Sequence, residues 1–479
     1  MDKIKFSKRT YNGYIEKQKQ LKFYLSAYKG GKDFIRLALN KYFREIDEQF
    51  KRRLESGYYL NYCKMVVDTV VKFIYSNIDE INIDIPEKIA FIAEDCDRNY
   101  SNIINFDSEV MRLGLIYGEI FVGVDVPFLE KQPKTLAEQK QYGVRPYLYL
   151  ILPERIRDYS ISETGEYNWV IIEETYIEDS NPEEERQVKN RYKIWFPDKW
   201  ELWEAGKNES DKDTLVSFGV HSFGRVPIVK FCPADIDRDG HGESSLRDIA
   251  NINAEILNIA SSINEEFFEL LFPLYLLPKD SCETDANGNL VINLSRNSAV
   301  VFQDQKPDIL RPDVATVDQK MAYIDMLRLE ILRISGLSNI SRKDQSFSQE
   351  SGISKALDFV QTNEMLSRYA EKKAEHLRKV LNLVAYSYSV PMDNILVSYP
   401  RDFNIYTEKD ELDRLQTLLS MDLSKTFNNT LKKRIVDRVL GSSITEAEYS
   451  LIEKEIAEKS ATTYGAVVNP LNLQLLNEV

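Results

Sequence analysis

Residues 242–389 contain three helical patterns, with a β-rich insertion after the first and a polar loop after the second. The first pattern follows Ser245 and Asp248, which have the spacing of a short capping box. Its apolar residues recur at alternating spacings of three and four, interrupted only by Glu266, at Ile249, Ile252, Ile256, Ile259, Ile263 and Leu270. This period predicts one packed helix over residues 245–272, roughly 40 Å long at about 1.5 Å per residue.

A helix of that length with one apolar seam needs a partner, and the sequence offers two. The second pattern, over 317–334, has apolar residues at Met321, Ile324, Leu327, Leu329, Ile331 and Leu332. The third pattern, over 353–389, runs through apolar residues from Ala356 to Val384. Residues 338–352 between these two patterns are too polar for a protein core, so we expect an exposed loop there.

The insertion after the first helical pattern is predicted to be a small β module. Residues 274–277 and 290–294 are short β-prone runs with a polar stretch between them. Asn287 and Gly288 in that stretch tolerate positive φ and predict a hairpin turn, and 299–302 offers a third strand. The chain therefore leaves a long helix, builds a β module roughly 40 Å away and returns on another helix.

These segments together resemble a known family. The order of "GESSLRDIANINAEILNIASSINE", a β insertion, "LRLEILRISGLS", a polar loop and "SGISKALDF" is similar to the portal proteins of tailed bacteriophages, above all those of long-tailed phages of Gram-positive hosts. The resemblance implies an α+β portal fold with an α/β wing, a long-helix stem, a small β-rich clip and a helical crown. The implied parts are 1–243 for an N-terminal arm and wing, 244–273 for the first stem helix, 274–315 for the clip, 316–336 for the second stem helix, 337–352 for a tunnel loop, 353–406 for a long wing helix and closing strand, and 407–479 for the crown and C-terminal tail.

The implied wing contains further elements that the sequence itself predicts. Residues 1–55 are polar and helical, and helices are expected over 61–76 and 106–117. Strands are predicted over 119–126, 146–152, 169–176, 192–196 and 226–231. Another strand is expected at 394–399, followed by polar helices. Thr445 and Glu448 form a capping box before the last of these helices.

The charge of the chain is unevenly distributed. The 479 residues have a net charge of −14, which argues against nucleic acid as a ligand of the whole surface, because phosphates are bound by Lys and Arg. Residues 1–53, however, hold 15 Lys and Arg against 6 Asp and Glu. This basic arm could touch nucleic acid, a membrane or an acidic partner. It could equally be the solvated surface of a helical extension.

The cysteines and the hydropathy indicate a cytosolic origin. Four widely spaced cysteines, without any CxxC pair, favour reduced thiols, and they are Cys63, Cys96, Cys232 and Cys282. No apolar run approaches 18 residues, and the N-terminus has no signal-peptide pattern. We therefore expect a soluble protein that is made where it acts, with no membrane partner.

The sequence offers little for catalysis. Three scattered histidines and the lack of a Walker motif give no obvious catalytic or nucleotide site. Asp235, Asp237, Asp239 and Gly240 match the front of an EF-hand calcium loop, but position twelve is Leu246, where a bidentate Glu is needed. We expect an acidic turn there, and no catalytic residue, cofactor or metal. The alternatives are a metal-dependent hydrolase that uses the 235–239 turn and a helical scaffold protein that forms no ring. Neither explains a β module between two long helices.

The resemblance also implies a function and its partners. Portal subunits form a dodecameric ring at one vertex of the capsid, where double-stranded DNA is packaged and ejected. The ring also docks the large subunit of terminase and a head–tail adaptor. Assembly in the host cytoplasm with major capsid and scaffolding proteins would place this protein in the virion. The polar loop offers candidate DNA contacts at Ser341, Arg342, Lys343, Gln345 and Ser346. The hairpin turn offers candidate terminase or adaptor contacts at Asp285, Asn287, Gly288 and Asn289.

Overall fold

The computed structural model forms two compact units, Met1–Phe403 and Asn404–Val479, which we describe separately. The residues that the structure describes are 5–76, 78–127, 144–179, 186–206, 211–271, 274–276, 283–284, 290–291, 308–310, 314–338, 352–388, 390–391, 394–403, 415–421, 424–440, 445 and 448–456. Together the described residues form an α+β fold, as the sequence predicts.

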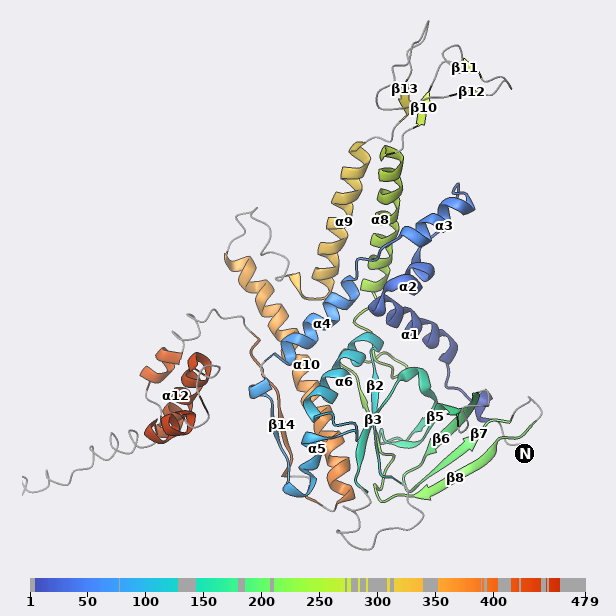
Figure 1. The fold of residues 1–479 in the computed structure, drawn as a ribbon. Helices are drawn as coiled ribbons and strands as arrows, with labels where there is room; N and C mark the ends of the chain where they lie inside the picture. Colours follow the sequence, from blue (N-terminus) through green and yellow to red (C-terminus); the bar gives the residue numbers. More distant parts are fainter. Residues whose placement is uncertain are drawn as a thin grey trace, which may run out of the picture. The chain divides into compact units, whose positions relative to one another are not determined.

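Two long helices form a rod in the first unit. Helices α8 (Ile249–Leu271) and α9 (Val314–Ile334) lie side by side (Figure 1). In the apolar seam of α8, Ile249, Ile256 and Ile263 are buried, whereas Ile252, Ile259 and Leu270 are half-buried. The α-helix begins after the predicted capping box, because residues 245–248 form turns and the Ser245 amide donates to the Leu115 carbonyl at 3.1 Å.

The predicted packing of α9 is only partly correct. Leu327, Ile331 and Leu332 are buried, and Ile324 is half-buried. Met321 and Leu329 are exposed, although we expected the whole apolar set to pack. The apolar residues of α9 extend too far around the helix for one neighbouring helix to cover them.

The β module between α8 and α9 pairs differently from the prediction. Strand β10 (Leu274–Leu276) pairs with β13 (Asp308–Leu310), and β11 (Glu283–Thr284) pairs with β12 (Leu290–Val291), both antiparallel. The two predicted strands therefore pair with other segments and not with each other. The predicted turn residues, 285–289, and the predicted third strand, 299–302, lie outside the described residues.

The remainder of the first unit contains two larger sheets. The smaller has the order β3-β2-β9, and the larger has the order β4-β5-β6-β7-β8. Their strands are β2 (Ile120–Asp125), β3 (Tyr147–Ile151), β4 (Ile156–Ile161), β5 (Tyr167–Glu178), β6 (Gln187–Trp195), β7 (Lys199–Glu204), β8 (Thr214–Val220) and β9 (Ile228–Phe231). All five predicted wing strands are present, whereas β4, β7 and β8 were not predicted. All six residues of β2 are buried, because helices and the other strands cover the central strand.

Helices surround the smaller sheet and the base of the rod. They are α1 (Tyr14–Lys29), α2 (Gly31–Ala38), α3 (Asp47–Ser56), α4 (Tyr62–Ile74), α5 (Phe91–Glu94), α6 (Ile103–Tyr117) and α10 (Gly352–Ser387). Helix α10 contacts both β2 and β9. Beyond α10, β14 (Leu396–Ser398) pairs with β1 (Asn82–Asp84), so the strand predicted at 394–399 is confirmed.

The second unit contains α12 (Lys425–Leu440) and a helical segment at 448–456. The predicted capping box is present, because the Glu448 amide donates to the Thr445 hydroxyl at 3.4 Å and the Glu448 carboxylate accepts from the Thr445 amide at 2.9 Å. An ion pair of 2.6 Å between Lys433 and Glu453 joins the two helical segments.

Candidate functional site

One side of α8 is polar and binds the segment that leads into α4. The Oδ1 atom of Asn253 accepts hydrogen bonds from the Tyr59 hydroxyl at 2.8 Å and from the amides of Tyr62 and Cys63 at 3.0 and 3.2 Å. Its Nδ2 donates to the Leu60 carbonyl at 2.8 Å. All four hydrogen bonds of this buried amide therefore fix the chain just before and at the start of α4.

The same side of α8 receives a buried arginine from the basic arm. The Arg53 guanidinium forms a 2.7 Å ion pair with Glu45, donates to the Ser261 hydroxyl at 3.0 Å and to the Asn40 carbonyl at 3.2 Å. It also lies 4.1 Å from the centre of the Tyr42 ring. At least one charge of the arm thus serves to hold the arm on the rod and is not available to an outside partner.

The acidic turn before α8 is organised by its own backbone. The Oδ1 atom of Asp237 accepts from the amides of Asp239 and His241 at 3.0 and 2.7 Å. In the part of the chain that the structure describes, no three His, Cys, Asp or Glu side chains are grouped so that they could hold a metal ion. The turn is therefore shaped by hydrogen bonds between the Asp237 side chain and the main chain of the turn.

A buried carboxylate attaches this turn to the sheet. Glu119 is 2% exposed and precedes β2. One of its oxygens is 2.9 Å from His241 Nδ1, and the other is 2.7 Å from Lys230 Nζ and accepts from the Gly242 amide at 3.0 Å. Burial alone would raise the pKa of Glu119, but the hydrogen bond from His241 and the charge of Lys230 outweigh burial and hold this pKa at about 2.

Two glycines allow the chain segments to meet at Glu119. A Cβ atom on Gly242 would lie 2.1 Å from the Gly118 carbonyl oxygen, which is closer than any real contact. Gly118 has φ +87°, a conformation that other residues rarely adopt. The rod therefore leaves the sheet through a backbone contact that only glycine can form.

A second buried charge holds α10 in place. Asp107 of α6 and Lys373 of α10 are 1% and 0% exposed and form a 2.6 Å ion pair. The other carboxylate oxygen of Asp107 accepts from the Tyr75 hydroxyl at 2.6 Å and from the Tyr399 hydroxyl. Burial lowers the pKa of Lys373, and Asp107 opposes that shift. This network joins α4, α6, α10 and the chain after β14.

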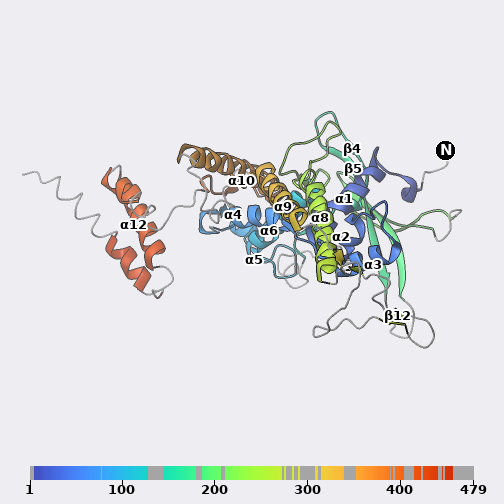
Figure 2. The ribbon, with the colours of Figure 1, turned by 90° about the horizontal axis from the view of Figure 1, so that it is seen from above.

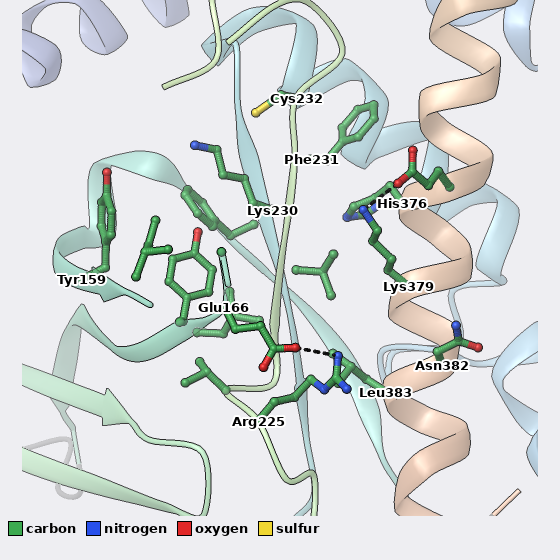
Figure 3. Close-up of a pocket in the computed structure, with 18 of the residues that line it drawn as sticks. Tyr159, Glu166, Arg225, Lys230, Phe231, Cys232, His376, Lys379, Asn382 and Leu383 are labelled. Carbon is green, nitrogen blue, oxygen red and sulfur yellow. Dashed lines mark ion pairs between the residues drawn. The ribbon is translucent and has the colours of Figure 1, made fainter. Parts of the chain in front are cut away.

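A cavity of about 840 Å³ lies between β9 and the C-terminal half of α10 (Figure 3). Ion pairs between Arg225 and Glu166 and between Lys379 and Glu375, 3.3 and 2.7 Å long, stand among its lining residues (Figure 3). The other lining residues with titratable side chains include Cys232 and His376.

These two lining groups are uncharged near neutral pH. Burial raises the pKa of the Cys232 thiol to about 11, and burial holds the pKa of His376 well below its usual range. A thiol of this kind is a poor nucleophile, since the thiolate is the reactive form. Neither Cys232 nor His376 is therefore activated for catalysis.

The residues predicted to contact DNA and the motor lie outside the described residues. This applies to the tunnel-loop candidates Ser341, Arg342, Lys343, Gln345 and Ser346, and to the clip candidates Asp285, Asn287, Gly288 and Asn289. Among the described helices, none combines the length and the hydropathy required to cross a bilayer.

A family model described as "Phage portal protein, SPP1 Gp6-like" matches residues 7–418, which is most of the chain. The chain belongs to this family of phage portal proteins. No curated protein matches the sequence. Among solved structures, a chain from the "Neck of native GTA particle computed with C12 symmetry" is 9% identical, with 82% of this chain and 90% of that chain covered and a TM-score of 0.36. That geometric likeness is too low to bear on function.

The family assignment agrees with the structural role of the portal's buried polar groups. Portal proteins are structural components of the virion and connect the phage head to its tail. Glu119, Asp107 and Asn253 fit such a role, because each joins segments that are far apart in sequence. Sequence reasoning missed all three, since each is a single polar residue next to or within an apolar element.

Replacement of Glu119 by Gln should lower portal stability in a pH-dependent manner. The pKa of this carboxyl falls from 4.5 to about 2 on folding, so its contribution is present above about pH 5 and is lost as the pH falls toward 2. We expect Glu119→Gln to lower the free energy of unfolding by about 3 kcal/mol at pH 7 and by less than half of that at pH 3. Urea unfolding followed by circular dichroism measures both values.

The matched control is Glu94→Gln, which changes an exposed carboxylate at the end of α5. It should alter stability by less than about 0.5 kcal/mol at either pH. An equal loss for Glu119→Gln at pH 7 and pH 3 would show that the Glu119 carboxylate contributes through shape and not through charge.

Proposed function

We propose that twelve copies of this portal protein form a ring at one vertex of the capsid, and that double-stranded DNA passes through the ring during packaging and ejection. The observation that carries the proposal is the family match over residues 7–418. The ring would also dock the large subunit of terminase and a head–tail adaptor. Assembly would take place in the host cytoplasm with major capsid and scaffolding proteins, and the Gram-positive host remains a prediction from sequence.

The paired helices α8 and α9 and the short β ladders between them in sequence support an assignment of parts. We assign the wing to 1–243 and 353–406, the stem to 244–273 and 316–336, the clip to 274–315, the tunnel loop to 337–352, and the crown and tail to 407–479. A stem of two helices can form the wall of a channel when subunits stand side by side.

The charge of the chain suits a channel that moves DNA. Each phosphate neutralised by Lys or Arg adds salt-dependent affinity and therefore resistance to movement. A net charge of −14 keeps most of the surface from binding DNA. We propose that contact is confined to a few loop residues, with Arg342 and Lys343 the foremost candidates.

The mass of the purified protein tests the ring. Twelve copies of 55.6 kDa give about 670 kDa, and negative-stain images of the same fraction should show a central hole. Light scattering over a range of salt and protein concentrations measures the mass. A monomer or dimer under every condition, including co-expression with the scaffolding and capsid proteins, would contradict the ring and favour the helical-scaffold alternative.

Shortening the tunnel loop should leave rings intact and impair packaging, because a polar loop between two long helices is suited to line the channel. The milder double substitution Arg342→Ala with Lys343→Ala should act in the same direction. The yield of nuclease-resistant DNA in heads reports packaging, and the control is Lys19→Ala with Lys22→Ala on the exposed surface of α1. Failure of ring formation in the loop variant would mean that the loop is structural.

Substitutions at the clip turn should weaken docking of the motor and leave ring formation unchanged. In chain order the turn candidates, Asp285, Asn287, Gly288 and Asn289, follow the short strand β11, which comes after the first stem helix and β10. Pull-down of terminase large subunit with Asp285→Ala and Asn289→Ala rings measures the effect. Undiminished binding of both terminase and adaptor would remove this assignment.

A further inference from the structure

Helix α9 has a second stripe of residues, on the face opposite its buried residues, and the three at the centre of this stripe are apolar. Residues at spacings of four, four, three and four form this outer stripe, and all are exposed: Asp318, Ala322, Met326, Leu329 and Arg333. Met326 and Leu329 are 53% and 42% exposed. No described residue covers these apolar side chains, and apolar stripes of this kind are typical of a contact surface.

The turn between α2 and α3 presents a complementary surface. Phe43 is 100% exposed and Ile46 is 58% exposed. Arg44 between them is exposed and forms no ion pair with any described residue. The fully exposed Phe43 leaves its apolar ring in water, and together with Ile46 it forms an apolar surface of the kind that marks a contact site.

The turn is rigid, although its tip is exposed. The Tyr42 hydroxyl donates to the Asn258 carbonyl at 3.0 Å, and the Tyr42 amide donates to the Glu45 carboxylate at 3.0 Å. The buried Arg53 pairs with Glu45 and lies over the Tyr42 ring. Phe43 is therefore held in position before any partner arrives, which lowers the entropy lost on binding.

The turn and the outer stripe lie at the same level of the rod but on different sides. Tyr42 lines a small groove together with Gln319, Lys320 and Tyr323 of α9, which are neighbours of Asp318 and Ala322 in sequence. Figures 1 and 2 both show α9 on one side of α8 and helices α2 and α3 on the other. A rotation about an axis parallel to the rod keeps this level unchanged, so it can bring the turn of one copy against the stripe of the next.

We propose that, in the ring, Phe43 and Ile46 of one subunit pack on Ala322, Met326 and Leu329 of its neighbour. The small Ala322 leaves space for an aromatic ring, and the flexible Met326 adapts to its shape. Because the turn and the stripe are different surfaces, the contact is head-to-tail and repeats around a closed ring. This inference rests on the proposed ring and names the residues that close it.

The charges beside the two surfaces are opposite. Asp318 heads the outer stripe, is exposed and forms no ion pair with any described residue. Arg44 stands next to Phe43 in the turn. The proposed contact therefore includes an ion pair between Arg44 of one subunit and Asp318 of the next, which would fix the register of the two rods.

Charge reversal tests the contact in the full-length chain. We expect Arg44→Glu and Asp318→Arg each to raise the protein concentration needed for half-maximal ring formation by at least about tenfold. The double variant should restore it to near the wild-type value. Lys22→Glu, the same change of charge on the exposed surface of α1, is the control and should have no effect.

A disulfide cross-link reports proximity independently of affinity. Phe43→Cys with Met326→Cys in one chain, treated with a mild oxidant, should give a ladder of covalent multimers on a non-reducing denaturing gel. Each single variant, which also contains the native cysteines, should give no such ladder. In a control pair, Phe43→Cys with Ile15→Cys, the second cysteine stands on α1 in place of an exposed apolar residue and not on the outer stripe. This pair should give no ladder.

The outcomes separate this contact from the ring itself. Wild-type chains that never form rings would remove the proposed function and this contact with it. Wild-type rings, with charge-reversal variants that behave like Lys22→Glu and no cross-linked ladder, would overturn this contact and leave the ring. A ladder without rescue in the double variant would overturn the Arg44–Asp318 pair.

Discussion

The attachment of the rod to the sheet depends on one buried carboxylate. Glu119 receives hydrogen bonds or charges from Lys230, His241 and Gly242, which belong to β9 and to the turn that leads into α8. A buried carboxylate is stable only when such partners outweigh the loss of water. The direction in which α8 leaves the sheet is therefore set by ionic and hydrogen-bond geometry, and the close approach of Gly118 permits it.

Helix α8 shows how one element can serve two kinds of neighbour. Its apolar seam packs against neighbouring helices, and apolar contacts alone leave alternative registers open. Its polar side does not tolerate sliding, because Asn253 matches backbone groups at the start of α4 and Asn258 matches the end of α2. Polar contacts of this kind specify one arrangement among several that apolar packing alone would allow. The proposed ring would need such uniqueness in every subunit.

The sequence predicts which residues of a helix or strand are buried, because that depends on local hydrophobic period. It misses buried polar contacts whose partners are distant in sequence. Ile256 belongs to a visible helical seam and is buried as expected. Asn253 looks like an ordinary helical residue, because its partners are about 190 residues away. The role of Glu119 is equally undetectable from the sequence, since its partner His241 is 122 residues further along the chain. Strand β7 was missed although its first four residues, Lys199–Leu202, alternate polar and apolar, a signal that could have found it. The tunnel-loop and clip residues remain predictions.

The docking of the arm on α8 has a consequence for how the chain is made. The arm leaves the ribosome before α8, because Asn258, which binds the Asn40 amide, is synthesised 218 residues later. At about 5–20 residues per second, the arm waits roughly 10–40 s for its binding surface. During that interval Phe34, Ile35 and Ala38, all buried in the finished protein, have no rod to pack against. Translation speed and chaperone access over this interval therefore bear on the yield of folded subunits as directly as the stability of the finished fold.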